Sequence, residues 1–192
     1  PDASYWAPGD TLNAAIGQGD NEFSPLQMAK YISMLANGGN KIDVSIIKTI
    51  RNADGTEESR DNINKFVKQK LGLSDDDSEN LNINQENLKV VLEGMRSVTE
   101  EGTAASIFKD FEIAVGGKTG SAEAPGNKVN AWFAGFAPFD NPEIAVVVMA
   151  ENGGHGYYTA DAVKQIMREY FGMNLQNVTE DVTASSYTET LR

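Results

Sequence analysis

The stretch that decides the fold of this 192-residue chain is Gly116-Gly117-Lys118-Thr119-Gly120-Ser121. Its residue types predict a β-strand with a chemically useful edge. Side chains alternate along a strand, so the hydroxyls of Thr119 and Ser121 point to one face. The glycines leave room for a ligand backbone, and the Lys118 ammonium supplies a fixed positive charge beside the hydroxyls. This combination of groups suits a carboxylate ligand.

The hexapeptide lies in the first of three predicted strands, 112–123, 128–137 and 143–151. The turn Asp140-Asn141-Pro142 is too short for a crossover helix, so the last two strands form an antiparallel hairpin. Residues 144–149 are apolar at both parities, which predicts cover on both faces. We therefore predict an α+β fold with an antiparallel β-sheet flanked by helices on both faces, incomplete in this chain.

Helices are predicted before and after these strands. Ser24 and Gln27 form a capping box, Pro25 takes the first helical position, and Gly38-Gly39 ends that helix. Residues 1–23, rich in turn formers, are predicted to be a surface loop. Further helices are predicted over 61–71, over about 85–98 behind a capping Asn84, and from Thr159 to Gly172. The predicted apolar face of the last helix consists of Val163, Ile166, Met167, Tyr170 and Phe171.

The composition excludes several classes of function. The formal net charge of -12 repels phosphate backbones and argues against nucleic-acid binding. The chain has no cysteine, which excludes thiol catalysis, cysteine zinc sites and disulfides. A single histidine, His155, is a poor basis for a histidine metal site. We expect no metal and no nucleic-acid partner.

Two other interpretations compete for Lys118-Thr119-Gly120. A phosphate-binding P-loop fails on spacing, because its first glycine would fall at Glu112 and no helix can follow Gly120-Ser121. A plain glycine-bearing strand with a surface lysine is the commoner explanation of an isolated tripeptide match. The surrounding sequence has to decide between that explanation and a functional one.

That surrounding sequence resembles the transpeptidase domain of class B penicillin-binding proteins, particularly those that build the cell wall during elongation. The resemblance covers most of residues 6–172 apart from about 42–83. Its blocks, in chain order, are Trp6-Ala7-Pro8-Gly9-Asp10-Thr11, Ile16-Gly17-Gln18-Gly19, Ser24-Pro25-Leu26-Gln27-Met28-Ala29, Ala36-Asn37-Gly38-Gly39, Gly102-Thr103-Ala104, Lys118-Thr119-Gly120-Ser121-Ala122-Glu123 and Trp132-Phe133-Ala134-Gly135-Phe136-Ala137-Pro138.

The resemblance implies acyl transfer through a covalent serine ester, with β-lactams as mimics of the D-Ala-D-Ala substrate. Lys118, Thr119 and Gly120 match the family's K-T-G motif. Lys118 would contact the serine of the S-x-N motif, and Thr119 and Ser121 would bind the substrate carboxylate. The Ser121 N–H would be one of two oxyanion-hole donors. No metal or organic cofactor is implied.

The resemblance also sets the expected limits of the domain. Residues 1–173 are predicted to be the C-terminal part of a transpeptidase domain, with a peripheral insertion at about 57–83, and 174–192 a polar, disordered tail. We expect the S-x-x-K and S-x-N motifs upstream, so that the chain is inactive alone and needs the missing N-terminal half. His155 and Tyr157 are placed at the rim of the active site, although a solvated loop histidine is the simpler interpretation of His155.

Expected partners are peptidoglycan stem peptides, β-lactams and a membrane glycosyltransferase, at the extracytoplasmic face of the bacterial membrane with the anchor upstream. Two alternatives stay open. One is a fragment of a serine β-lactamase or D,D-carboxypeptidase, which a short full-length protein without a large N-terminal module would favour. The other is a non-catalytic β-lactam-sensing or binding module, which loss of the S-x-x-K motif would indicate.

Overall fold

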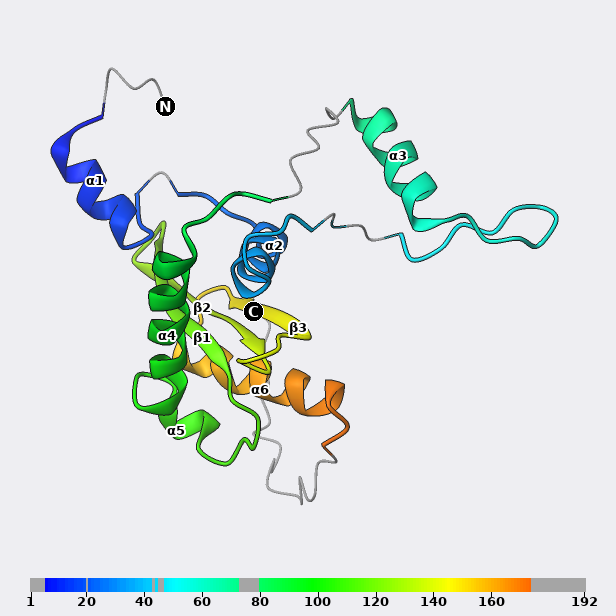
Figure 1. Ribbon diagram of the computed structural model, residues 1–192. Coiled ribbons are helices and arrows are strands. Elements are labelled where there is room, and N and C mark those ends of the chain that lie inside the picture. The colour runs from blue at the N-terminus through cyan, green and yellow to red at the C-terminus, as the bar shows by residue number, and fades with distance from the viewer. Residues whose placement is uncertain (1–5, 20, 43, 45–46, 73–79, 174–192) are drawn as a thin grey trace, which may run out of the picture.

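A three-stranded antiparallel sheet forms the centre of the molecule (Figure 1). The strands are β1 (Gly116–Ala124), β2 (Lys128–Ala137) and β3 (Ile144–Ala150), and β2 lies between the other two. Both hairpin pairings are antiparallel, as the sequence predicts. The computed structural model describes residues 6–19, 21–42, 44, 47–72 and 80–173.

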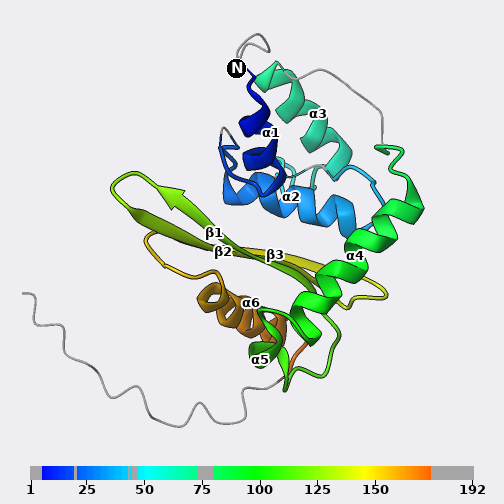
Figure 2. The ribbon, with the colours of Figure 1, turned by 90° about the vertical axis from the view of Figure 1, so that its left-hand side faces the viewer.

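Helices cover both faces of this sheet, which confirms the predicted α+β class (Figure 2). One face packs against α2 and the first part of α4, and the other packs against α6 with α5 beside it. The remaining helices, α1 and α3, lie beyond α2 and away from the strands (Figure 2). The helices are α1 (Pro8–Ala15), α2 (Pro25–Ala36), α3 (Arg60–Leu71), α4 (Gln85–Glu100), α5 (Ala105–Phe108) and α6 (Tyr157–Tyr170).

Each face of the sheet has its own apolar core. Phe133 is fully buried among residues of α5 and α6, whereas Phe136 is fully buried against α2 and α4 on the other face. The two parities of β3 divide in the same way: Val146 joins the first core and Val147 packs against the second. The prediction that β3 is covered on both faces is therefore confirmed. Burying each large apolar side chain contributes about 1.5–3 kcal/mol.

The predicted capping residues begin their helices as expected. The Gln27 N–H donates to Ser24 Oγ at 3.3 Å, and the Gln27 side chain accepts from the Ser24 N–H at 2.8 Å. The Asn84 side chain accepts from the Asn87 N–H at 3.0 Å. These bonds satisfy N–H groups that a helix start leaves without partners.

The loop predicted for residues 1–23 is wrong over α1. Pro8 occupies the first turn of this helix, where its missing N–H costs nothing. The Asp10 carboxylate accepts from the Ala7 N–H at 2.7 Å and so caps the same turn. The sequence Pro-Gly-Asp, which resembles a turn, is here the start of a helix.

The first strand also begins later than predicted, at Gly116 rather than at 112. The preceding residues make other contacts: the Phe139 N–H donates to Ala114 O at 2.8 Å, and Thr99 Oγ1 donates to Val115 O at 2.5 Å. The carbonyls of Ala114 and Val115 therefore have partners outside the sheet ladder.

The apolar face predicted for α6 is partly wrong. Ile166 and Tyr170 are 45% and 52% exposed, whereas Lys164, which no apolar pattern could include, is buried. The Lys164 ammonium donates to Ile107 O at 2.7 Å and to the Asp110 carboxylate. This hydrogen bond is the main reason why the pKa of Asp110 is lowered. A charge can lie in this position because it is paired and hydrogen-bonded.

Residues 47–72, which include α3, project from the rest of the molecule (Figure 1). The predicted turn at Asp54-Gly55 is present, but the segments on its two sides pair only through an isolated bridge between Arg51 and Glu57 and do not form two strands. Helix α3 lies where a helix was predicted over 61–71. The predicted tail, residues 174–192, falls outside the described residues. Among the residues that are described, no helix is long and apolar enough to cross a membrane.

Candidate active site

Strand β1 has one edge that no other described strand covers, and Lys118 to Ser121 lie along it. Lys118 is exposed opposite Ala134, and its ammonium donates to Thr119 O at 2.6 Å. The lysine therefore lies on a strand at the sheet margin, as the sequence predicts. A charged group in this position is available to an anion that approaches the edge.

The Thr119 hydroxyl lies 2.9 Å from the Thr103 hydroxyl, and either oxygen can be the donor. Thr103 belongs to the turn between α4 and α5. Two backbone hydrogen bonds hold this turn to the end of α4, from the Gly102 N–H to Ser97 O at 2.8 Å and from the Ala104 N–H to Val98 O at 3.0 Å. The second hydroxyl beside the K-T-G strand was not anticipated from the sequence.

Ser121 has contacts on both its side chain and its backbone. Its hydroxyl accepts from the Gly156 N–H at 3.3 Å, and its carbonyl accepts from Gln18 Nε2 at 3.4 Å. In an antiparallel strand the N–H and C=O of one residue point to the same side. Because the Ser121 carbonyl meets Gln18 and not β2, its N–H also points to the open edge.

The glycines of β1 have a packing role that differs from the predicted one. A Cβ atom on Gly116 would overlap the Phe136 ring, and one on Gly117 would overlap the Phe133 ring. Both glycines are buried and make room for cross-strand aromatic rings, not for a ligand. Gly120 is half-buried, and a Cβ on it would lie 3.2 Å from Trp132 Cβ.

Gly156 is a further residue of the site that the sequence did not single out. A Cβ here would come within 2.6 Å of Trp132 O and would also overlap Gly120 O. The loop before α6 can therefore lie against β1 only with glycine at this position. Its place in a glycine-rich loop was visible in the sequence, but its contact with β1 depends on the tertiary fold.

His155 and Tyr157 flank Gly156 and are exposed. Their rings stack with centroids 6.1 Å apart at an interplanar angle of 14°, and Tyr157 and Tyr158 lie 4.1 Å apart. A side-chain hydrogen bond with Tyr158 raises the pKa of Tyr157. Since Gly156 contacts Ser121, this aromatic segment is next to the K-T-G strand; a role at the active-site rim stays a prediction.

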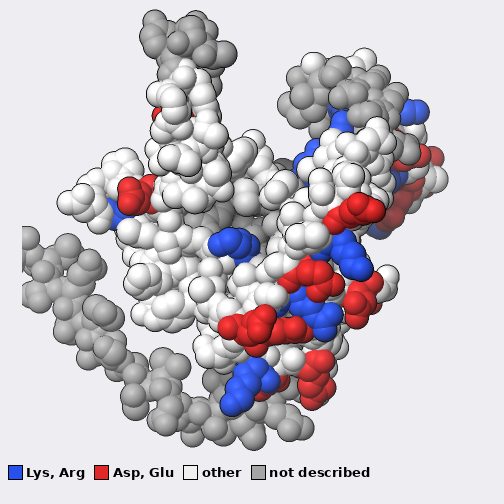
Figure 3. All heavy atoms as spheres, turned by 60° about the vertical axis from the view of Figure 1, so that its left-hand side comes forward, with Lys and Arg blue, Asp and Glu red and all other residues white. Residues whose placement is uncertain are grey.

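The density of charged side chains differs between the K-T-G strand and the neighbouring helix α4. On the face shown in Figure 3, most acidic and basic side chains gather along one side, over α4. Helix α4 contains Glu93, Arg96 and Glu100, of which the last two form an i,i+4 ion pair. Within the described residues, no three histidine, aspartate or glutamate side chains cluster closely enough to hold a metal ion.

The expectation that the S-x-x-K and S-x-N motifs lie only upstream is wrong for the sequence patterns themselves, because this chain contains matches to both. Ser45-Ile46-Ile47-Lys48 and Ser106-Ile107-Phe108-Lys109 fit the first pattern, and Ser78-Glu79-Asn80 fits the second. Ser45, Ile46, Ser78 and Glu79 lie outside the described residues. Two fixed residues in four are matched often by chance, so the surroundings must show whether a match is functional.

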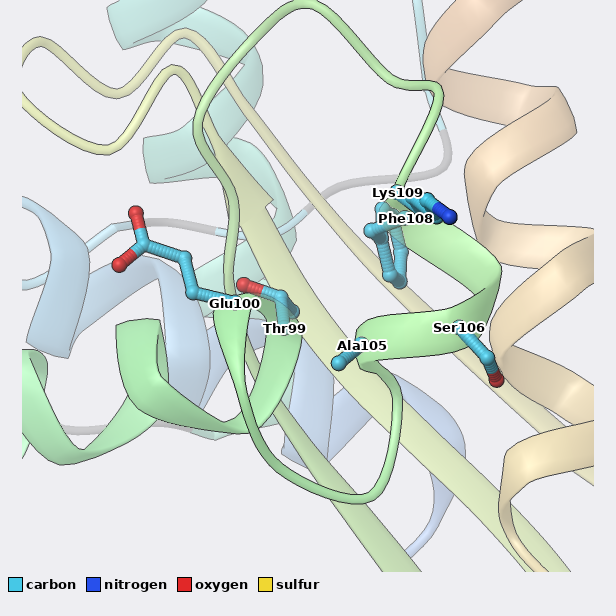
Figure 4. A pocket seen from close by; sticks show the side chains of 6 residues that line it. All are labelled: Thr99, Glu100, Ala105, Ser106, Phe108 and Lys109. Atoms are coloured by element: carbon cyan, nitrogen blue, oxygen red, sulfur yellow. The ribbon is translucent and has the colours of Figure 1, made fainter.

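For Ser106 those surroundings do not form a catalytic pair. Ser106 and Lys109 line an open pocket next to Thr99, Glu100, Ala105 and Phe108; Ser106 is the second residue of the four-residue helix α5, and Lys109 follows its last residue (Figure 4). In the part of the chain that the structure describes, neither side chain hydrogen-bonds the other or any residue of the K-T-G strand. The pocket and the site on β1 are therefore distinct.

Comparison with known proteins gives a single family. Residues 2–172 match the model described as the penicillin-binding protein transpeptidase domain. The chain is 28% identical over 186 residues to the peptidoglycan D,D-transpeptidase MrdA of Haemophilus influenzae, covering 86% of this chain and 26% of that protein. It is 34% identical over 148 residues to penicillin-binding protein H of Bacillus subtilis, covering 72% and 20%.

Solved structures agree with these relatives. The crystal structure of Pseudomonas aeruginosa PBP2 in complex with WCK 5153 aligns with a TM-score of 0.69 and 32% identity, covering 96% of this chain and 38% of that one. A chain from a peptidoglycan synthase complex that coordinates polymerization and crosslinking aligns with a TM-score of 0.67 and 31% identity, covering 91% and 28%. This chain spans about a quarter of the length of the curated relatives that it matches.

Proposed function

Because the chain belongs to the penicillin-binding protein transpeptidase family, as part of a class B domain of the elongation type, we propose that it supplies one wall of a peptidoglycan D,D-transpeptidase active site. The observation that carries this proposal is the open edge of β1, where Lys118, the Thr119 hydroxyl and an outward Ser121 N–H lie together. Relatives named as peptidoglycan D,D-transpeptidases support the enzyme class.

In the proposed reaction, a serine hydroxyl attacks the carbonyl of the penultimate D-Ala of a stem peptide. The serine ester forms, the terminal D-Ala leaves with a proton, and an amine of a second stem then displaces the serine to form the cross-link. Lys118 and the Thr119 hydroxyl bind the carboxylate of the acyl donor. The Ser121 N–H donates to the oxyanion, and a donor of this kind typically contributes about 2.7–4 kcal/mol to transition-state stabilisation.

We propose that the nucleophilic serine comes from a part of the protein outside these 192 residues. Ser106 is the described serine that fits S-x-x-K, and it lines the pocket by α5 with no side-chain hydrogen bond, among the described residues, to Lys109 or to the K-T-G strand. Ser45 fits the same pattern, lies outside the described residues, and belongs to a stretch that resembles no family block. The matched relatives are about three and a half times as long as this chain, which leaves room for such a segment.

The expected partners follow from the same comparisons. A structural relative at 31% identity comes from a complex described as coordinating polymerization and crosslinking. We extend this to the present protein as a proposal: it works beside a membrane glycosyltransferase, at the extracytoplasmic face of the membrane, on peptidoglycan stem peptides. β-Lactams acylate the same serine.

Covalent labelling with a fluorescent penicillin tests the proposal. The full-length protein should be labelled, and Lys118→Ala should weaken the labelling by about tenfold or more, since a fixed charge on the carboxylate is lost. The chain of 192 residues alone should stay unlabelled. Thermal unfolding of each variant shows whether a loss of labelling reflects unfolding.

Ser106→Ala and Ser45→Ala in the full-length protein are the matched controls. Both should be labelled like the wild type, because neither residue is the proposed nucleophile. Loss of labelling in either one, or labelling of the isolated chain, contradicts the assignment of the nucleophile. A full-length protein that hydrolyses the acyl-enzyme within seconds would instead support the β-lactamase alternative.

A further inference from the structure

The turn between α4 and α5 brings a second threonine to the K-T-G strand. Thr103 Oγ1 lies 2.9 Å from Thr119 Oγ1, although the two residues are 16 positions apart. Within the described residues, Thr103 makes no other side-chain hydrogen bond. Its hydroxyl therefore has one partner, and that partner is the group proposed to hold the substrate carboxylate.

The position of Thr103 is fixed by the packing around it. One turn earlier, the buried Thr99 donates to Val115 O at 2.5 Å, so the end of α4 is hydrogen-bonded to the residue that precedes β1. Ala104, next to Thr103, is fully buried in the core between the sheet and α6. A Cβ on Gly102 would lie 2.8 Å from Val98 Cα, so the turn can approach α4 this closely only with glycine there. Thr103 is thus held in place and is not on a freely moving loop.

The direction of the hydrogen bond decides what Thr103 can do. A hydroxyl has one proton to donate and two lone pairs to accept with. If Thr119 donates to Thr103, its proton is no longer available to a carboxylate. If Thr103 donates to Thr119, the Thr119 proton is free, and the chain of two hydrogen bonds makes it a stronger donor.

A carboxylate at the edge selects between these two arrangements. It accepts hydrogen bonds only, and bonds to an ionised acceptor are roughly twice as strong as neutral ones. The arrangement in which Thr103 donates to Thr119 and Thr119 donates to the carboxylate is therefore the stable one when an acyl donor is bound.

We propose that Thr103 is a positioning residue of the transpeptidase site, whose hydroxyl orients the Thr119 hydroxyl toward the carboxylate of the acyl donor. This inference rests on the proposed function. It adds a residue that acts through Thr119. It also predicts that loss of this residue weakens binding of the substrate carboxylate in particular.

The test uses the full-length protein and two ligands, benzylpenicillin and its methyl ester, which lacks the carboxylate. Formation of the acyl-enzyme is followed by mass spectrometry. Thr103→Val, which keeps the branched shape, should slow acylation by benzylpenicillin about tenfold, in line with the loss of support for one hydrogen bond to a charged group. The rate at which the methyl ester acylates the same variant should stay within about twofold of the wild-type rate. Thr103→Ser should restore the rate of acylation by benzylpenicillin.

A double variant gives the second readout. If Thr103 acts through Thr119, then Thr103→Val in a Thr119→Val background should cause no further loss. Equal losses with both ligands, a multiplicative loss in the double variant, or a wild-type rate for Thr103→Val would each overturn the inference while leaving the proposed function intact. A wild-type protein that benzylpenicillin does not acylate would overturn both.

Discussion

The two ends of β1 contrast within a few residues. Gly116 and Gly117 are buried beneath the rings of Phe136 and Phe133, one on each face of the sheet. Lys118 to Ser121 follow directly, and there the strand is exposed or half-buried along its open edge. The first end is part of the core, and the second carries the proposed chemistry.

This contrast explains how a reactive edge can be held still. The Phe133 ring fits into the space that Gly117 leaves, and Phe108 of α5 stacks on it with centroids 5.6 Å apart. The strand is therefore anchored immediately before the functional residues. A rigid neighbour allows Lys118 and Thr119 to be exposed without losing their positions.

Gly117→Ala is expected to have the largest effect on stability. The new methyl group overlaps the Phe133 ring, and overpacking of this kind costs about 1–3 kcal/mol. Gly94→Ala makes the same chemical change in open space on α4 and should stabilise the helix by about 1 kcal/mol. The unfolding temperature of the intact protein should therefore fall for Gly117→Ala and rise for Gly94→Ala. A neutral Gly117→Ala would show that the packed end of β1 is looser than its contacts imply.

Asp110→Asn should have a smaller effect, and that effect should depend on pH. Hydrogen bonding from Lys164 lowers the pKa of Asp110 below its ordinary value of 3.8. A carboxyl group with a lowered pKa stabilises the folded state above its unfolded pKa, and this contribution is lost as the pH falls through the folded pKa. The difference in stability between wild type and Asp110→Asn should thus be constant near pH 7 and shrink below about pH 4. Unfolding curves across this range measure it, and a difference that stays constant would contradict the role of the charge.

Lys118→Ala should have the smallest effect on stability, within about 0.5 kcal/mol, because its side chain is exposed and, among the described residues, hydrogen-bonds only the neighbouring carbonyl. The same variant is expected to lose labelling by penicillin. A wild-type unfolding temperature together with weak labelling would show that Lys118 serves function and not stability, in contrast to Gly117. A large drop in the unfolding temperature would instead give Lys118 a structural role.

Local signals in the sequence were sufficient for much of the fold. The Ser24 and Asn84 caps mark the starts of α2 and α4, and the short turn at residues 140–142 predicts the hairpin of β2 and β3. The errors arise where local signals have two meanings. Pro8-Gly9-Asp10 suits a turn as well as the first turn of a helix, and only the capping bond to Ala7 distinguishes them.

The site could be predicted only where its residues are adjacent in the chain. Lys118 and Thr119 are neighbours on one strand, so their motif was legible in the sequence. Thr103, Gln18 and Gly156 reach the same strand from three distant segments, and nothing local in their sequence indicates a contact with β1. Lys164 is a similar case, since its burial depends on a carboxylate 54 positions away.

The contacts along the open edge of β1 have one more consequence, for solubility. An uncovered strand edge is a template onto which a strand from another molecule can add, and such additions lead to aggregation. Here Thr99 donates a hydrogen bond to Val115 O, the Lys118 ammonium donates to Thr119 O, and the Gln18 side chain donates to Ser121 O. Of the four residues of β1 whose carbonyls point to this edge, Gly117, Thr119, Ser121 and Glu123, two thus have an engaged carbonyl, and Val115 just before the strand has one as well. A foreign strand would therefore find only part of the acceptors free to pair with.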